Sequence, residues 1–279
     1  MPYAAEISRA NPSCFLFLLD QSGSMEDGFG GSASGRSKAQ ELADVINRLL
    51  QTLATRCAKG EDVRDYFDIC VVGYGQTVGS ALRPPLGGRY FVRISEIAFN
   101  PAVLESRTER VPDGAGGFVE QAYYFPVWVD AAHAGETPMC AALRHVQNAL
   151  EQWIAAHPGS YPPTVVHITD GEATDGDPTA TAGAIRALAT SDGPVSFFNL
   201  HLSSTASRPL TFPSSDAELP DDFARMLFSM SSLLPDSIRR EAATEGYAVT
   251  PASRGFAFNA DLGETIRFID IGTRVATIR

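Results

Sequence analysis

An aspartate and two serines directly follow the first long apolar run of the chain. The run is Phe15–Leu19, and the turn after it contains Asp20, Ser22 and Ser24. An apolar run of this length that ends in turn residues is typical of a buried strand, and ligands bind outside the carboxyl ends of strands in open α/β sheets. Carboxylate and hydroxyl oxygens suit Mg²⁺, Mn²⁺ or Ca²⁺ better than Zn²⁺. The turn is therefore a candidate site for a hard divalent cation.

A second aspartate occupies the same kind of position later in the chain. The segment 164–169 is another buried-strand pattern, and it ends in Asp170-Gly171. Two strands that each end in an aspartate bring both carboxylates to one rim of a sheet, so we expect Asp20 and Asp170 to lie close together. Two carboxylates with nothing between them repel each other, and a divalent cation removes that repulsion.

Both turns also have a purely structural interpretation. Aspartate and serine are good helix caps, but the first helical pattern starts near Lys38, too far from Asp20 for capping to explain the whole turn. Asp170-Gly171 could be a simple turn, although the buried strand before it favours a site. Asp177, a little further on, is expected to cap the helix that starts at Pro178.

Thr137 has a local interpretation that competes with a functional one. It precedes Pro138 and a helix expected from about Met139. A threonine followed by proline is a common helix cap with proline at the first helical position, and the local sequence alone favours this interpretation.

The whole series of motifs resembles the metal-ion-dependent adhesion site (MIDAS) of von Willebrand factor type A (vWA) domains. The series is Asp20-x-Ser22-x-Ser24, then Thr137-Pro138, then Asp170-Gly171, and its order and spacing match that family. The resemblance covers most of the chain, from about Ser13 onwards. It implies that Ser22, Ser24 and Thr137 give hydroxyl ligands to a metal, and that Asp20 and Asp170 coordinate it directly or through water. It also implies an open position, filled by a carboxylate from a partner protein.

The resemblance implies Mg²⁺ or Mn²⁺ as the metal, whereas Ca²⁺ fits less well. Mg²⁺ retains waters and prefers octahedral oxygen geometry, so a site with few direct protein ligands is chemically reasonable.

Three segments near the C-terminal end are similar to bacterial intracellular vWA proteins. They are residues 227–232, 255–261 and 268–274. Such proteins often occur beside a Ser/Thr kinase and a PP2C-type phosphatase, or beside AAA+ ATPases. The resemblance therefore implies a regulatory or scaffolding role in a signalling, stress or defence system.

Composition excludes several other classes of protein. Lys and Arg number 22 against 33 Asp and Glu, and the net charge of −11 argues against nucleic acid or an anionic membrane surface as partner. No segment approaches the ~18 apolar residues of a transmembrane helix, and Met1–Asn11 lacks a signal-peptide pattern. The four cysteines form no C-x-x-C pair, so we expect reduced, structural thiols and a cytoplasmic protein.

Apolar periodicity predicts strands that alternate with helices. We expect helices over 38–57, 139–154, 178–189, 223–230 and 262–275, and strands over 15–19, 66–75, 164–169, 195–202 and 255–258. This alternation predicts an α/β fold with a doubly wound, mostly parallel central sheet flanked by helices. We expect residues 1–279 to form a single vWA domain with insertions at about 26–37, 76–136 and 203–220.

The sequence thus predicts a divalent-metal-dependent protein–protein interaction module, not an enzyme. No catalytic residue and no organic cofactor is assigned, because neither H-E-x-x-H nor G-x-S-x-G occurs. Two alternatives stay open: a metal-dependent phosphoester hydrolase, and a scaffold in which the metal only braces the loops. A haloacid-dehalogenase-like hydrolase would need an aspartate where this chain has Ser22.

Overall fold

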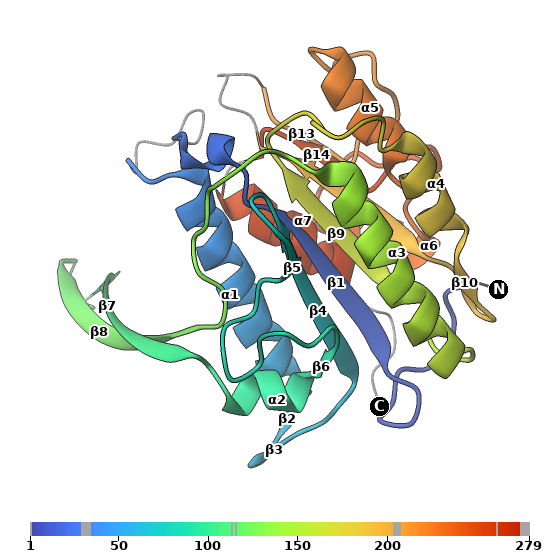
Figure 1. Cartoon of the computed structure of the whole chain (residues 1–279). Coiled ribbons are helices and arrows are strands. Elements are labelled where there is room, and N and C mark those ends of the chain that lie inside the picture. Colours follow the sequence, from blue (N-terminus) through green and yellow to red (C-terminus); the bar gives the residue numbers. More distant parts are fainter. Residues whose placement is uncertain are drawn as a thin grey trace.

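A central sheet is the frame of the protein (Figure 1), for which the computed structural model describes residues 2–28, 35–112, 114, 116–202, 208–260 and 262–273. The eight strands of this sheet are β1 (Ser13–Asp20), β4 (Phe67–Tyr74), β5 (Val78–Ser80), β6 (Val92–Arg93), β9 (Thr164–Thr169), β12 (Ser196–His201), β13 (Leu210–Thr211) and β14 (Phe256–Phe258). Their order is β13-β14-β12-β9-β1-β4-β5, with β6 also paired to β4.

The five inner strands of the sheet are parallel. β14, β12, β9, β1 and β4 pair in parallel, whereas β13, β5 and β6 join the edges antiparallel. From β1 the chain crosses to β4 on one side, and it later builds β9, β12 and β14 on the other side. The sheet is therefore doubly wound, as the sequence predicts, and the direction of winding reverses between β1 and β9.

Helices cover both faces of this sheet (Figure 1). They are α1 (Lys38–Cys57), α2 (Ile94–Phe99), α3 (Met139–Ala156), α4 (Thr179–Ala187), α5 (Asp222–Met230), α6 (Asp236–Thr244) and α7 (Leu262–Thr273). In β1, Phe15 and Phe17 pack in the core layer with α1 and α7, while Leu16 and Leu18 pack with α3, α4 and α5. Because both faces are covered, β1 is buried along its whole length, which is why its sequence is continuously apolar.

The first helix begins where its capping residues dictate. The Ser37 hydroxyl accepts a hydrogen bond from the Gln40 backbone N–H, and the Gln40 side chain accepts one from the Ser37 N–H. This reciprocal capping box fixes the start of α1 at Lys38, the residue at which the apolar pattern predicts it.

Residues 76–136 contain β5, β6, α2 and a long two-stranded ribbon. The ribbon consists of β7 (Val103–Pro112) and β8 (Phe118–Val127), which pair antiparallel and project from the body beside α1 (Figure 1). Two short hairpins lie elsewhere at the surface, β2 (Ala58–Lys59) with β3 (Asp62–Val63) and β10 (Ala189–Thr190) with β11 (Gly193–Pro194).

Two helices were not predicted, and a third is described only in part. Helix α2 has six residues, of which Ile94 and Ile97 are buried, and it is too short to show a helical period. Helix α6 was not predicted, because only Ile238 and Ala242 of its nine residues are buried and this is too weak an apolar pattern to detect. The closing helix is described to Thr273, and Val275, which was expected in it, lies outside the described residues. Among the described helices, none is both long and apolar enough to cross a membrane.

Candidate metal centre

The two predicted aspartates lie at the carboxyl ends of adjacent parallel strands. Asp20 is the last residue of β1 and Asp170 follows the last residue of β9, where Leu19 pairs with Ile168. This is the point at which the winding of the sheet reverses, and in open α/β sheets ligands bind in the crevice at that point.

The Asp20 carboxylate is buried and held by the chain itself. It is 1% exposed; Oδ1 accepts a hydrogen bond from the Ser22 backbone N–H at 2.9 Å, and Oδ2 accepts one from the Thr169 hydroxyl at 2.6 Å. Burial raises the pKa of Asp20 because the charged form loses its hydration, although these hydrogen bonds oppose the rise. The nearby charge of Asp170 adds to the rise in pKa.

The Asp170 carboxylate joins the serine turn to the first helix. Its Oδ1 accepts a hydrogen bond from the Ser24 hydroxyl at 2.8 Å, and its Oδ2 lies 2.5 Å from the Lys38 ammonium. The Ser24 hydroxyl is in turn 3.1 Å from the Ser22 hydroxyl. Three of the predicted ligands therefore form one connected group of oxygens.

Thr137 lies close to the same group. A methyl group added at Gly171 would be 3.5 Å from the Thr137 hydroxyl oxygen and 3.6 Å from that of Ser24. Thr137 is not the cap of α3, because Pro138 holds the cap position. The structural interpretation of Thr137 as a helix cap is therefore wrong.

Another carboxylate caps α3 instead. Asp175 accepts hydrogen bonds from the backbone N–H groups of Cys140 and Ala141, at 2.9 and 2.8 Å. Pro178 holds the cap position of α4, but Asp177 just before it accepts a hydrogen bond from the Thr179 N–H at the start of that helix, so its side chain does satisfy a helix-terminal N–H group as predicted.

Backbone hydrogen bonds fix the relative positions of the three loops at the rim. The Gly23 N–H donates to the Gly135 carbonyl at 3.0 Å, and the Ala134 N–H donates to the Gln21 carbonyl at 2.7 Å. Thr137 exchanges two hydrogen bonds with Thr174, one in each direction. The Thr137 loop is thus tied both to the β1 turn and to the loop after β9.

The spacing of the oxygens fits an octahedral cation. At metal–oxygen distances of about 2.0–2.1 Å, neighbouring ligands of an octahedron lie about 2.9 Å apart. The Ser22–Ser24 and Ser24–Asp170 oxygen pairs are separated by 3.1 and 2.8 Å. No group of three or more His, Cys, Asp or Glu side chains in the described part of the chain could hold a metal, so hydroxyls must supply much of any ligand set here.

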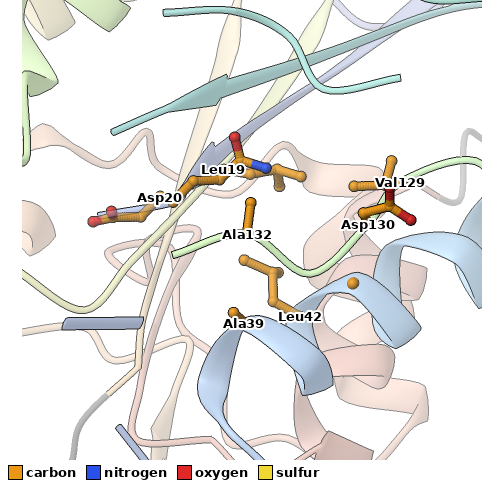
Figure 2. Close-up of a pocket in the computed structure, with 9 residues that line it drawn as sticks. Leu19, Asp20, Ala39, Leu42, Val129, Asp130 and Ala132 are labelled. Carbon is orange, nitrogen blue, oxygen red and sulfur yellow. The ribbon is translucent and has the colours of Figure 1, made fainter. Parts of the chain in front are cut away.

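The small cavity beneath the β1 turn is not a ligand site. Its volume is about 10 Å³, no more than one water molecule requires. In Figure 2 the carboxylates of Asp20 and Asp130 lie at opposite ends of the lining residues, with Ala39, Leu42 and Ala132 between them. The carboxylates therefore do not converge on this cavity.

A larger cavity of about 790 Å³ lies at the other end of the sheet. Arg186 and Arg240 line it together with Pro194 and Val195, which precede β12. It is therefore at the amino end of the strands, away from Asp20 and Asp170.

A chain of buried polar side chains runs from the site through the sheet. The Tyr74 hydroxyl lies 3.5 Å from Asp20 Oδ2 and 2.7 Å from His167 Nε2, and His167 Nδ1 lies 2.8 Å from Asn199 Oδ1. The Asn199 amide nitrogen donates to the Ser231 hydroxyl and to the Leu227 carbonyl, so its oxygen is the atom that faces His167. His167 therefore carries its proton on Nδ1 and accepts a hydrogen bond from Tyr74 at Nε2.

Sequence reasoning missed three polar contributors around the site. Thr169 immediately precedes Asp170, and its position at the end of a strand was the available signal. Lys38 was expected as an ordinary first helical residue, but it is 2% exposed and contacts Asp170. Tyr74 ends β4, the neighbour of β1, and its register partner is Asp20.

Comparisons with known proteins give only distant likenesses. No protein-family model matches the chain, and no curated protein matches its sequence. Among solved structures, proximal thread matrix protein 1 from the mussel byssus, described with a zinc-occupied MIDAS motif, is 16% identical over 82% of this chain and 43% of its own, with a TM-score of 0.41.

Two bacterial pilus proteins also match. The vWF domain of the type V pili tip protein Mfa5 from Porphyromonas gingivalis is 14% identical over 61% of this chain and 40% of its own, with a TM-score of 0.30. The PilB minor pilin from Streptococcus sanguinis is 10% identical over 98% of this chain and 62% of its own, with a TM-score of 0.48. The chain spans less than two thirds of the length of each of these proteins, and such likenesses assign neither a ligand nor a partner to it.

Proposed function

We propose that the protein is a vWA-type, divalent-metal-dependent module for protein–protein interaction. The observation that carries the proposal is the connected group of Ser22, Ser24 and Asp170 oxygens, whose separations match those of neighbouring ligands in an octahedron. This group lies at the carboxyl ends of the strands, at the point where the winding of the sheet reverses. Asp20 and Thr137 would complete the set. Mg²⁺ or Mn²⁺ suits these oxygens, and Ca²⁺ suits them less because it takes more ligands at longer distances.

A metal at this site would supply an open coordination position for an Asp or Glu carboxylate of a partner protein. The chain's own residues would hold the metal and keep the surroundings rigid. Burial of Asp20 and the backbone hydrogen bonds between the three rim loops support that rigidity. A fixed carboxylate contact in a partly dry site gives specificity as well as affinity.

We further propose a reducing compartment, such as the cytoplasm. The four cysteines are free and buried, and burial raises the pKa of the Cys57 and Cys70 thiols to about 12, which makes them poor nucleophiles. A Ser/Thr kinase, a PP2C-type phosphatase or an AAA+ ATPase is proposed as partner on the resemblance of the C-terminal segments alone.

The first test is thermal unfolding with and without Mg²⁺, Mn²⁺ or Zn²⁺. The wild type should unfold about 5–10 °C higher at a hundredfold excess of metal over Kd, because only the folded state binds. Ser22→Ala/Ser24→Ala should lose this rise, while Ser214→Ala/Ser215→Ala, an exposed pair outside the site, should keep it. An unchanged Tm in the wild type at millimolar metal would count against the proposal.

Two further measurements separate the alternatives. If a partner binds equally well in chelator, or to an intact Asp20→Ala variant, the metal has at most a bracing role. Hydrolysis of p-nitrophenyl phosphate that requires Mg²⁺ and is lost in Asp20→Ala would instead favour the hydrolase, in which Asp20 would have to be freed from Ser22 and Thr169.

A further inference from the structure

One of the chain's two lysines is buried against the proposed metal site. Lys59 is exposed, whereas Lys38 is 2% exposed. Lysine is almost never fully buried unless it is paired. Lys38 is also the first residue of α1, where the partial positive charge of the helix N-terminus disfavours a cation. Its position thus carries two costs that a specific interaction must offset.

That interaction is with the residues of the site itself. The Lys38 ammonium lies 2.5 Å from Asp170 Oδ2 and 3.4 Å from the Ser24 carbonyl oxygen. The Asp170 side chain is fully buried, and its other oxygen accepts the Ser24 hydroxyl hydrogen bond. A cation therefore already neutralises the carboxylate that a metal would require.

Charge counting shows what this lysine does to the site. Two carboxylates and one ammonium leave one net negative charge, and a divalent ion would turn this into one net positive charge. Without Lys38 the same site would carry two negative charges when empty and none when loaded. The lysine therefore weakens the attraction for the metal and leaves the loaded site positive, which favours a partner carboxylate.

We propose that Lys38 is a built-in counter-cation that competes with the divalent metal for Asp170. It stabilises the empty site and sets the metal affinity below the value that the oxygen ligands alone would give. The inference rests on the proposed function, because it concerns occupancy of the same site. A lysine with only a packing role would instead stabilise the empty and loaded forms equally.

The test compares Lys38→Met, which removes the charge at similar length, with Lys38→Arg, which keeps it. Lys59→Met is the matched control at an exposed position. Isothermal titration with Mn²⁺ should give at least tenfold tighter binding for Lys38→Met, whereas Lys38→Arg and Lys59→Met stay within threefold of the wild type. In chelator Lys38→Met should unfold below the wild type, and saturating Mn²⁺ should close most of that gap.

Each other outcome has a definite meaning. Mn²⁺ binding by Lys38→Met that equals or is weaker than in the wild type overturns the inference, while the proposed function stands if Ser22→Ala/Ser24→Ala abolishes binding. If Lys38→Met binds Mn²⁺ and the wild type does not, the inference holds in its strongest form, since the lysine would then exclude the metal. Absence of binding in both overturns the inference and the proposed function together.

Folding of the variant is itself informative. If Lys38→Met does not fold in chelator, folding rescued by Mn²⁺ supports the competition, because the metal then replaces the lost charge. Failure to fold in saturating Mn²⁺, for both Lys38→Met and Lys38→Gln, overturns it.

Discussion

At the scale of single residues, two buried histidines lie on the strands behind the site. His167 is fully buried on β9 and His201 is nearly so on β12, between the rings of Phe223 and Phe258. Burial lowers the pKa of each histidine to about 4, because the charged imidazolium loses its hydration. Both side chains therefore stay neutral in the folded protein down to mildly acidic pH.

This neutrality predicts a loss of stability on acidification. Between pH 7 and 5 the unfolded chain takes up a proton at each histidine, with a pKa of about 6.5, while the folded chain does not. The folded state binds fewer protons, so its stability falls as pH falls, by about 2 kcal/mol for each histidine. His201→Phe keeps a ring between Phe223 and Phe258. Between pH 7 and 5 its free energy of unfolding, measured by urea denaturation, should fall by about 2 kcal/mol less than that of the wild type.

The raised pKa of Asp20 acts in the opposite direction on acidification. It is common to both proteins, so the difference between them isolates His201. Equal pH dependence of wild type and His201→Phe would show that His201 titrates normally in the fold.

The residues of the proposed metal set could be read from the sequence, whereas their surroundings could not. Asp20, Ser22 and Ser24 are local neighbours at a strand end, so a short motif reveals them. Lys38 acts on them from a position that has no distinctive sequence context, and Thr169 is marked only by its place at the end of a strand. The burial of Lys38 depends on Asp170, 132 residues away, and no periodicity reports such a pairing.

At the scale of elements, helix α1 holds the segment that leads from the ribbon to the Thr137 loop. Asn47, buried in α1, accepts hydrogen bonds from the Trp128 and Val129 N–H groups and donates one to the Val129 carbonyl. The Asn47 side chain thus satisfies three backbone groups of Trp128 and Val129, which follow the end of β8 and lie outside any regular strand.

Removing that side chain should be costly. Asn47→Ala leaves three buried backbone groups without partners, and we expect a loss of about 2–4 kcal/mol in the free energy of unfolding. Thr52→Ala on the exposed face of the same helix should change stability by less than about 0.5 kcal/mol. Guanidinium denaturation measures the free energy of unfolding of the two variants. Equal losses would show that the Asn47 hydrogen bonds do not stabilise this segment.

The elements with strong local signals were predicted closely. Helix α1 and strand β9 have the predicted bounds because a capping box and a continuous apolar run define them. The ribbon was expected only as a hairpin within a long insertion, since residues 105–110 of β7 are all polar and most of both strands is exposed. Neither strand therefore shows the period-two pattern of polar and apolar residues that identifies a half-buried strand.

At the scale of the whole molecule, the ribbon is attached at its base. Arg107 forms two hydrogen bonds with Asp44 of α1 and lies 3.7 Å from the ring centre of the buried Phe125. The described residues between 108 and 122 are exposed, apart from the half-buried Val111 and Gly117.

The outer part of the ribbon should therefore be dispensable for folding. Replacing 108–122 by an Asn-Gly turn joins Arg107 to Tyr123, which are paired neighbours in the ribbon. We expect the free energy of unfolding to change by less than about 1 kcal/mol, because little apolar surface is lost. Urea denaturation with an unchanged transition would bear this out, whereas a loss above about 3 kcal/mol would mean that the ribbon packs on the body.

The buried histidine–asparagine pair also bears on how the strands find their partners. β1, β9 and β12 are buried along their whole length, so burial alone does not distinguish the native alignment from one that is slipped by two residues. In the native alignment His167 lies directly opposite Asn199, and the two share a hydrogen bond. A slipped alignment would separate His167 from Asn199 and leave two buried polar groups without hydrogen-bond partners, at a cost of about 1–3 kcal/mol each. The His167–Asn199 pair thus specifies the register of β9 against β12 during folding, which burial of these strands alone would leave open.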